Sequence, residues 1–221
     1  MPDQNVTEAV VRPAPRWRRR KATRPAEILT AALDSFVERG YEATRLEDVA
    51  RAAGCTKGTI FLYYEGKAEL FKAAVRDAML PMLEAAEHTA DGHTGCSREL
   101  LEALLRQRWD LMRKTRLSGL PKLMFAEAGK FPELALFYHD EVIHRLHALL
   151  TRVLEAGVAR GEFRSMDVPN TARIAIAPIM MAAIWRHSFE AVVEPPIEPE
   201  VFFTVSLDHF FRGIVADQSR S

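Results

Sequence analysis

A three-residue turn, Gly54-Cys55-Thr56, separates two short helical segments and constrains the fold more than any other feature of the chain. After the turn, Thr56 is typical of a helix N-cap, and the segment it opens is expected to run to about Tyr64. Two short helices joined by a glycine-led turn form a helix-turn-helix unit, whose second helix can enter a DNA groove. Before the turn, apolar residues recur at helical spacing, namely Leu46, Val49, Ala50 and Ala53.

The rest of the chain also has helical periodicity and no convincing strand alternation. A first helix is expected from about Pro25, which suits a first turn, to a C-cap at Gly40. Thr44-Arg45-Leu46-Glu47 has the pattern of a capping box, so Thr44 is expected to cap the second helix. A longer helix is expected from about Lys67 through Leu80, with Pro81 as a place to kink. After a polar boundary loop at 88–97, helices are expected near 98–117, 120–128, 132–160, 169–191 and 199–214.

Composition places this chain among ordinary globular proteins, since 48% of its 221 residues are hydrophobic and 30 basic residues balance 30 acidic ones. The longest apolar run, Ile174 to Trp185, is too short to span a membrane and is interrupted by Pro178. The N-terminus lacks the apolar stretch of a secretory signal. Cys55 and Cys96 lie far apart without a metal-binding partner nearby, which indicates reduced thiols and a cytoplasmic protein.

A basic segment precedes the first helix, with seven basic residues and no acidic residue between Arg12 and Arg24. Such an arm beside a folded domain suggests a polyanionic partner, although a solvated tail is the alternative. We hypothesise that the arm reaches phosphates or a neighbouring minor groove through Arg16, Arg18, Arg19, Arg20 and Lys21.

The stretch ILTAALDSFVERGYEATRLEDVARAAGCTKGTIFLYYEGKAELF resembles the DNA-binding domain of the TetR family of transcriptional regulators. The likeness covers residues 25 to about 72, and FPELALFYHDEV with GVARGEF resembles one branch of the family's variable ligand-binding domains. The resemblance implies a homodimer formed through the last two helices, a palindromic operator and an inducer pocket. It also implies an all-α chain divided into a basic flexible arm at 1–23, a helix-turn-helix domain at 24–72 and a ligand-binding and dimerisation domain at 73–221.

Carried over by position, the family's DNA contacts fall on Thr44, Lys57, Gly58, Thr59, Phe61, Leu62, Tyr63 and Lys67. Thr56 offers a further hydroxyl, and Lys67 could act with a helix N-terminus on one phosphate. Many relatives have tyrosine in place of Phe61 and a polar residue in place of Leu62, so these contacts could be apolar here. Packing against the first helix is the alternative for Ile60, Leu62 and Tyr64.

The C-terminal helices contain aromatic and methionine residues that could line a cavity for a largely hydrophobic ligand, although core packing is the simpler role for any one of them. No cofactor is expected. The candidates are Trp109, Met112, Phe125, Phe137, His144, Met180, Met181 and Trp185. Broad apolar surfaces on the last two helices suit a dimer interface, or burial within one subunit; they carry Ile174, Ile176, Met180, Ile184, Phe202, Leu207, Phe210 and Phe211.

Asp140, His144 and His147 share one face of an expected helix. Two imidazoles and a carboxylate could bind a divalent metal or transfer protons, while the alternative is a polar flank of a buried helix. The sequence has no nucleophile motif and no glycine-rich phosphate loop. It therefore predicts a ligand-responsive regulator, most simply a repressor, and no enzyme; a metal-dependent enzyme on the Asp140 face and a constitutive DNA binder remain as alternatives.

Overall fold

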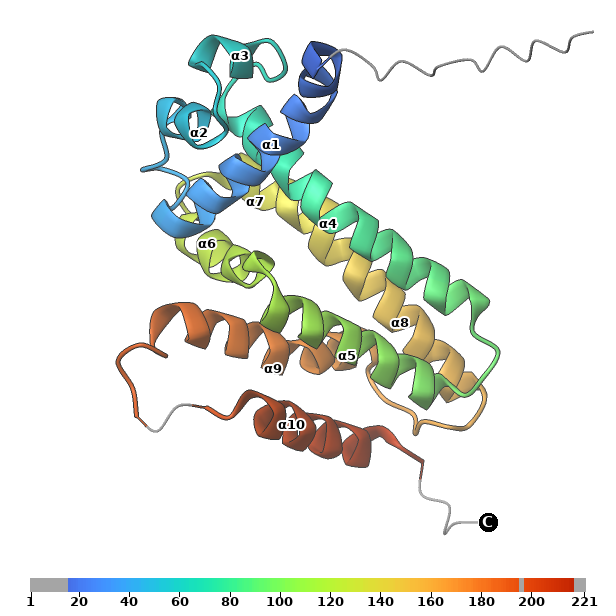
Figure 1. The fold of residues 1–221 in the computed structure, drawn as a ribbon. Coiled ribbons are helices and arrows are strands. Elements are labelled where there is room, and N and C mark those ends of the chain that lie inside the picture. The colour runs from blue at the N-terminus through green and yellow to red at the C-terminus, as the bar shows by residue number, and fades with distance from the viewer. Residues whose placement is uncertain (1–15, 195–196, 217–221) are drawn as a thin grey trace, which may run out of the picture.

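The computed structural model describes residues 16–194 and 197–216, with side chains from Arg24 onwards. Within this part every regular element is a helix, and the single β pairing is an isolated bridge between Phe163 and Val215. Figure 1 shows a small group of helices at one end, joined by one long helix to a larger bundle. The predicted all-α architecture is confirmed.

Helix α1 (Arg16–Arg39) begins at Arg16, well before the expected start near Pro25. Residues 16–23, predicted to be part of a flexible arm, therefore extend this helix, while residues 1–15 lie outside the described residues. Proline fixes a backbone φ that a helix accepts, and the residues just before Pro25 are mostly Arg, Lys and Ala, which are strong helix formers. These preferences allow the helix to continue on the N-terminal side of the proline.

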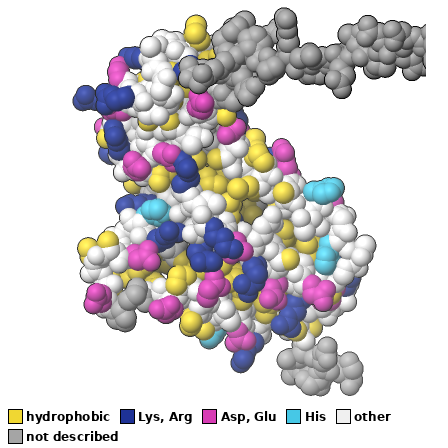
Figure 2. Space-filling model, viewed as in Figure 1, with side chains coloured by type: hydrophobic (Ala, Val, Ile, Leu, Met, Phe, Trp, Pro, Cys, Tyr) yellow, Lys and Arg dark blue, Asp and Glu magenta, His cyan; other side chains and the backbone are white. Residues whose placement is uncertain are grey.

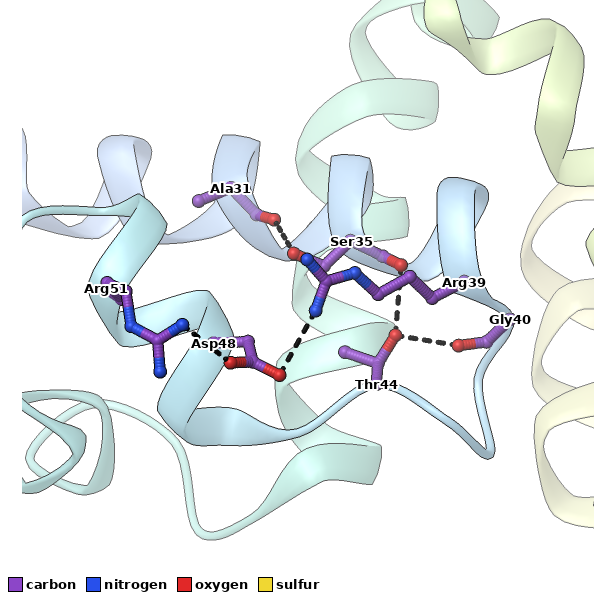
Figure 3. Close-up of polar contacts among 7 residues, drawn as sticks. All are labelled: Ala31, Ser35, Arg39, Gly40, Thr44, Asp48 and Arg51. Carbon is purple, nitrogen blue, oxygen red and sulfur yellow. Dashed lines mark hydrogen bonds and ion pairs between the residues drawn. The ribbon is translucent and has the colours of Figure 1, made fainter.

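The turn between α1 and α2 (Leu46–Ala52) is held by a buried threonine (Figure 3). The Thr44 hydroxyl lies 2.7 Å from the carbonyl oxygen of Gly40 and 3.0 Å from that of Ser35, so its single hydrogen serves the C-terminal end of α1. Gly40 has φ 86°, which favours glycine. The predicted capping box is wrong: Arg45 is the N-cap of α2, and it makes no side-chain capping bond.

Helix α3 (Lys57–Phe61) follows the predicted turn, in which Gly54 has φ 63°. Thr56 caps this helix as expected, because its hydroxyl accepts the Thr59 amide at 3.2 Å. The helix ends at Phe61, earlier than predicted. The amides of Tyr63 and Tyr64 both donate to the Ile60 carbonyl at 3.0 Å and so close the helix.

Helix α4 (Lys67–Gly92) runs through Leu80 as expected and continues past Pro81, the residue at which we expected a kink. The boundary loop is therefore shorter than predicted, because α5 (Ser97–Lys114) begins soon after α4 ends. Helix α4 runs beside α8 (His144–Ala159) in Figure 1. Ion pairs join α4 to α8 and to the turn that precedes it: Arg76 with Glu141 at 2.7 Å, Arg145 with Glu87 at 2.7 Å, and Arg152 with Asp91 at 3.0 Å.

The remaining helices lie close to their expected positions. They are η1 (Arg116–Ser118), α6 (Gly119–Glu127), α7 (Pro132–Tyr138), α9 (Val168–Ser188) and α10 (Pro199–Ile214). The segment predicted as one helix over 132–160 is continuous, but it contains a π-helical turn, η2 (His139–Ile143), between α7 and α8. A π turn inserts an extra residue and so rotates the faces that follow it.

The end formed by α1, α2 and α3 shares one hydrophobic core with the larger bundle, and α1 packs directly on α6. A Cβ on Gly119 would collide with the Val37 side chain, so the two helices approach closely. Glu127 of α6 also binds the turn after α1, since its Oε1 accepts the amide of Tyr41 at 3.1 Å and that of Glu42 at 3.4 Å. These contacts orient the small end relative to the bundle.

Candidate nucleic-acid interface and ligand cavities

The N-terminal end of α3 is open to solvent. Lys57 and Gly58 are exposed, and a Cβ on Gly58 would meet only the Thr56 hydroxyl, at 3.8 Å. Ile60 is fully buried and anchors the opposite face of this short helix in the core. The three residues after it project outward, because Phe61, Leu62 and Tyr63 are 48%, 80% and 40% exposed. An edge with an open backbone, hydroxyls and a cation has the properties of a DNA-reading surface.

Lys57 is already paired with a neighbouring helix. Its ammonium lies 2.7 Å from Glu47 Oε1 of α2 and 5.7 Å from the centre of the Phe61 ring. The hydrogen bond from Lys57 holds the pKa of the Glu47 carboxyl below its usual range. The sequence analysis did not predict that Glu47 would bind Lys57 in place of DNA, since this contact depends on how α2 and α3 cross. The hydroxyls of Thr56 and Thr59 bind each other at 2.9 Å.

Thr44 and Lys67 lie differently from the expectation. Thr44 is buried and its hydroxyl hydrogen is used within the α1–α2 turn, so its side chain has no donor to offer a phosphate. The Lys67 ammonium donates to the Glu42 carbonyl at 2.9 Å and lies 4.6 Å from the Tyr41 ring centre. Partial burial there lowers the pKa of Lys67. Two of its three N–H groups remain for other acceptors, so a phosphate contact stays a prediction for Lys67.

The packing alternative for the residues around α3 is partly right. Ile60 is buried and Tyr64 packs against the core, but Leu62 is largely exposed. For Arg18, Arg19 and Arg20 the structure places the backbone in the first turns of α1, while their side chains lie outside the described residues. Their contact with DNA stays a prediction.

One cavity, of about 260 Å³, lies between α5, α9 and the start of α10. It brings together Trp109, Met112 and Trp185, which the sequence analysis had proposed as ligand-binding residues. The Trp109 ring stacks on Phe203 with centres 4.8 Å apart, and its Nε1 donates to Glu200 Oε1 at 3.3 Å. These two contacts fix the indole that forms one wall of the cavity.

The other proposed ligand residues lie elsewhere. Phe125, Met181 and His144 are exposed, because α6, α9 and α8 each turn one face to solvent. Phe137 is buried, and the Arg76 guanidinium lies 4.9 Å from its ring centre. Met180 is half-buried against the core. None of these five residues lines the cavity that holds Trp109, so a ligand contact stays a prediction for them.

A second cavity, of about 290 Å³, lies between α4, α5 and α8. Figure 2 shows hydrophobic side chains gathered in a hollow at this place on the molecular face. The sequence analysis missed this cavity because its walls come from three helices whose packing the sequence does not reveal. The apolar part of the wall is formed by Met79, Met82, Leu83, Ala86, Leu104, Leu111, Leu146 and Leu149, and the polar part by Gln107, Arg108, Asp110, Lys114 and Thr115. Asp110 is paired with Lys114 at 3.0 Å.

Asp140, His144 and His147 do not form a metal centre. The Asp140 carboxylate lies 2.7 Å from His139 Nδ1, the histidine that was not expected to join it. Among the residues that the structure describes, no group of three histidine, cysteine, aspartate or glutamate side chains could hold a metal ion. Burial lowers the pKa of His147, which favours the neutral imidazole. The polar-flank alternative is therefore the better description of this face.

Helices α9 and α10 carry apolar residues on their outer surface. Ile174 and Met181 of α9 are 62% and 53% exposed, and Val201 and Val205 of α10 are 62% and 49% exposed. Other residues proposed for an interface, namely Ile176, Leu207 and Phe211, are buried within the subunit. By length and composition alone α9 could cross a membrane, yet it packs against α5, α6, α8 and α10. An uncovered apolar face of this kind is typical of protein interfaces.

Comparison with known proteins agrees with this arrangement. A family model described as bacterial regulatory proteins, tetR family, matches residues 28–74, and one described as tetracyclin repressor-like, C-terminal domain, matches residues 91–194. The chain is similar to the HTH-type transcriptional regulator RutR of Escherichia coli strain K12, with 25% identity over 222 residues that cover 95% of this chain and 97% of RutR. It is also similar to the HTH-type transcriptional repressor KstR2 of Mycolicibacterium smegmatis, with 25% identity and coverage of 74% and 80%.

Solved structures share the fold. The structure of the transcriptional regulator FadR from Bacillus subtilis, in complex with stearoyl-CoA, superposes with a TM-score of 0.73 at 19% identity and covers 85% of this chain and 98% of FadR. The two family models fall on the helix-turn-helix end and on the larger bundle, which are the two parts that the fold separates. The chain therefore belongs to the TetR family of DNA-binding transcriptional regulators.

Proposed function

We propose that this protein is a dimeric repressor that binds a palindromic operator through α3 and is released from it by a hydrophobic small molecule. The observation that carries the proposal is the free N-terminal end of α3, where Lys57 and Gly58 are exposed and the backbone is open. A helix presented in this way can enter a major groove and place its first residues against base edges. Such a regulator acts in the cytoplasm, where its DNA lies.

The uncovered apolar face of α9 and α10 supports the dimer. Ile174, Met181, Val201 and Val205 would be buried if two copies packed these helices together. Two recognition helices related by a two-fold axis would then face successive major grooves, which requires an operator with matching symmetry.

The path of α4 supports release by a ligand. The first residue of α4 follows directly on the segment after α3, and Met79, Met82 and Leu83 of the same helix line the cavity between α4, α5 and α8. A ligand that fits one position of α4 better than another would shift the population of α3 positions. The FadR structure was solved with stearoyl-CoA and the KstR2 relative is named a repressor, which makes both parts of the proposal reasonable for this chain.

Selection of bound sequences from a random DNA pool tests the assignment. We expect a palindrome whose half-sites are separated by about one helical turn, and Lys57→Ala should weaken binding to it by roughly tenfold. Leu136→Ala is the matched control, because Leu136 is an exposed residue of α7 outside the proposed interface. Purified dimers that enrich no sequence, or a Lys57→Ala variant with unchanged affinity, would contradict the role of α3.

A thermal-shift screen with hydrophobic small molecules separates an inducible repressor from a constitutive DNA binder. We expect at least one class of compound to stabilise the protein and to lower its affinity for the selected operator. If compounds bind without changing operator affinity, the protein binds DNA independently of ligand and the inducible part of the proposal is wrong.

A further inference from the structure

Arg108 of α5 is buried in apolar surroundings without an acidic partner. The residue is 8% exposed, and its Nε finds no hydrogen-bond acceptor. Across residues 24–194 and 197–216, no carboxylate forms an ion pair with this guanidinium. The ionisable group that affects the pKa of Arg108 is the hydroxyl of Tyr138, a residue that is 3% exposed. The neighbouring residues Leu104, Leu105 and Trp109 are all buried.

Keeping a guanidinium in such a place is unfavourable. Transfer of a charged group out of water costs free energy that only a paired opposite charge or hydrogen bonds can offset. Burial lowers the pKa of Arg108, and burial also raises the pKa of Tyr138, so the tyrosine stays neutral and cannot neutralise the cation. The folded protein therefore holds a positive charge that is hydrogen-bonded by the neutral Tyr138 but not paired with a carboxylate, and this charge lies at a cavity.

The cavity beside Arg108 provides an apolar surface next to the charged group. Arg108 lines it, and most of the remaining wall is apolar: Met79, Met82, Leu83 and Ala86 from α4, and Leu146 and Leu149 from α8. Methionines adapt to different hydrocarbon shapes. The volume of about 290 Å³ lies at the small end of the range for ligand sites, which favours a compact molecule.

We propose that the cavity between α4, α5 and α8 binds a small amphipathic carboxylate, whose acidic group pairs with Arg108 and whose hydrocarbon lies between α4 and α8. A guanidinium presents its N–H groups in a planar fork that matches a carboxylate, and burial strengthens such a pair. The idea that this acid is the inducer rests on the proposed function, whereas its binding does not.

Isothermal titration with matched ligands tests the proposal. The probes are straight-chain carboxylates from hexanoate to dodecanoate, the aromatic acids benzoate and phenylpropionate, and the primary alcohol that corresponds to each acid. We expect at least one acid to bind at least about tenfold more tightly than its alcohol, because a hydrogen bond to a charged group is worth more than one between neutral groups. The straight-chain and aromatic series distinguish the shape of the hydrocarbon.

The Arg108→Met variant tests whether Arg108 is the residue that pairs with the carboxylate of the ligand. This variant keeps an unbranched apolar stem without the guanidinium and should lose roughly 10- to 100-fold in affinity for the acid while affinity for the alcohol is unchanged. Arg108→Lys keeps the positive charge but not the planar fork of N–H groups. Its affinity for the acid should lie between those of the natural protein and Arg108→Met. Arg106→Met, which alters an exposed arginine of the same helix, should leave acid binding unchanged. Circular dichroism and operator affinity without added acid show that each variant is folded and binds DNA.

Two results would overturn the inference: every acid binds no better than its alcohol, or Arg108→Met binds the acid as well as the natural protein does. In either case Arg108 has a structural role with Tyr138. Operator binding is measured separately, so these results leave the repressor assignment standing. If the acid binds through Arg108 but does not release the operator, the site is supported and its assignment as the inducer site is wrong.

Discussion

The Lys57 ammonium lies 2.7 Å from Oε1 of Glu47, so the cation at the tip of the recognition helix is held by a carboxylate of the preceding helix when DNA is absent. Both side chains are about half exposed, which means that solvent screens the pair and a phosphate can displace the carboxylate. Glu47 therefore competes with DNA for Lys57 and adds a negative charge beside the proposed contact surface.

Replacing Glu47 by glutamine should strengthen operator binding. The Glu47→Gln substitution frees Lys57 and removes a charge that repels phosphates, so we expect affinity to rise roughly two- to fivefold at low salt. Fluorescence anisotropy over a salt series measures this change. Glu155→Gln, on the exposed face of α8, is the control for net charge. Weaker operator binding by the Glu47→Gln variant would show that Glu47 positions Lys57 for DNA instead of competing with it.

The basic start of α1 should contribute a salt-dependent part of DNA affinity. Replacing Arg18, Arg19 and Arg20 by glutamine keeps helix propensity and removes three positive charges. We expect the slope of log affinity against log salt to become shallower by about one for each phosphate that these arginines neutralise in the natural protein. A slope equal to that of the natural protein would assign these arginines no part in binding.

The contact between Gly119 and Val37 should be energetically important for the orientation of the DNA-binding end. Gly119→Ala places a methyl group against Val37 and should lower the free energy of unfolding by about 1–3 kcal/mol. Val37→Ala makes room, so the double variant should be more stable than the sum of the two single changes predicts. Chemical denaturation of the four proteins measures this coupling. Strict additivity would mean that α1 and α6 can separate slightly at no cost.

A charge on the outer face of α9 or α10 should break the dimer. Ile174→Lys and Val205→Lys each put an ammonium where the proposed interface is apolar, and each should raise the dimer dissociation constant by roughly tenfold or more. Light scattering and operator titration should change together. Leu136→Lys alters an equally exposed apolar residue of α7 and should leave the dimer intact. Dissociation of that control instead would place the interface on α7.

His187, in the last turn of α9, should make the fold sensitive to mild acid. His187 Nε2 lies 2.7 Å from the Ser118 hydroxyl, and burial, together with Arg186 and Lys122, lowers the pKa of His187. The unfolded chain then binds more protons than the folded one as pH falls through the usual histidine range, so the free energy of unfolding should decrease from about pH 7.5 to about pH 5.5.

Urea denaturation at both pH values measures this decrease. The His187→Asn variant should show a smaller decrease in the free energy of unfolding. Part of the decrease should remain, because burial also lowers the pKa of His147. His88→Gln, at an exposed histidine of α4, is the control and should leave the decrease unchanged. An equal decrease in the natural protein and in His187→Asn would assign the sensitivity to other groups.

Local backbone chemistry explains why most helices could be predicted. Gly40 and Gly54 both adopt positive φ at the positions where turns were expected, and Thr56 caps α3 through its own hydroxyl. Prolines were less informative, because Pro25 and Pro81 both lie inside helices that continue around them. Neighbouring packing decides whether a helix tolerates a proline, and one sequence does not reveal that packing.

The site was predictable where it depends on neighbours in the chain. The exposed end of α3 follows from the turn and the cap, whereas the Lys57–Glu47 pair depends on the crossing of two helices. Arg108 resembles many surface arginines in sequence, and only the packing of α4 and α8 around α5 makes it a buried, unpaired cation. The π turn at His139–Ile143 likewise could not be predicted from the helical spacing.

The unbroken length of α4 has a mechanical consequence. About fifteen residues separate its first residue from the cavity-lining Met82, which corresponds to roughly 22 Å of helix. A tilt of about 5° at the cavity would therefore carry the far end through about 2 Å, a large error for side chains that must meet base edges. Pro81 donates no hydrogen bond to the turn before it, so this rod is weakest right beside the cavity, where a small occupant can bend it most easily.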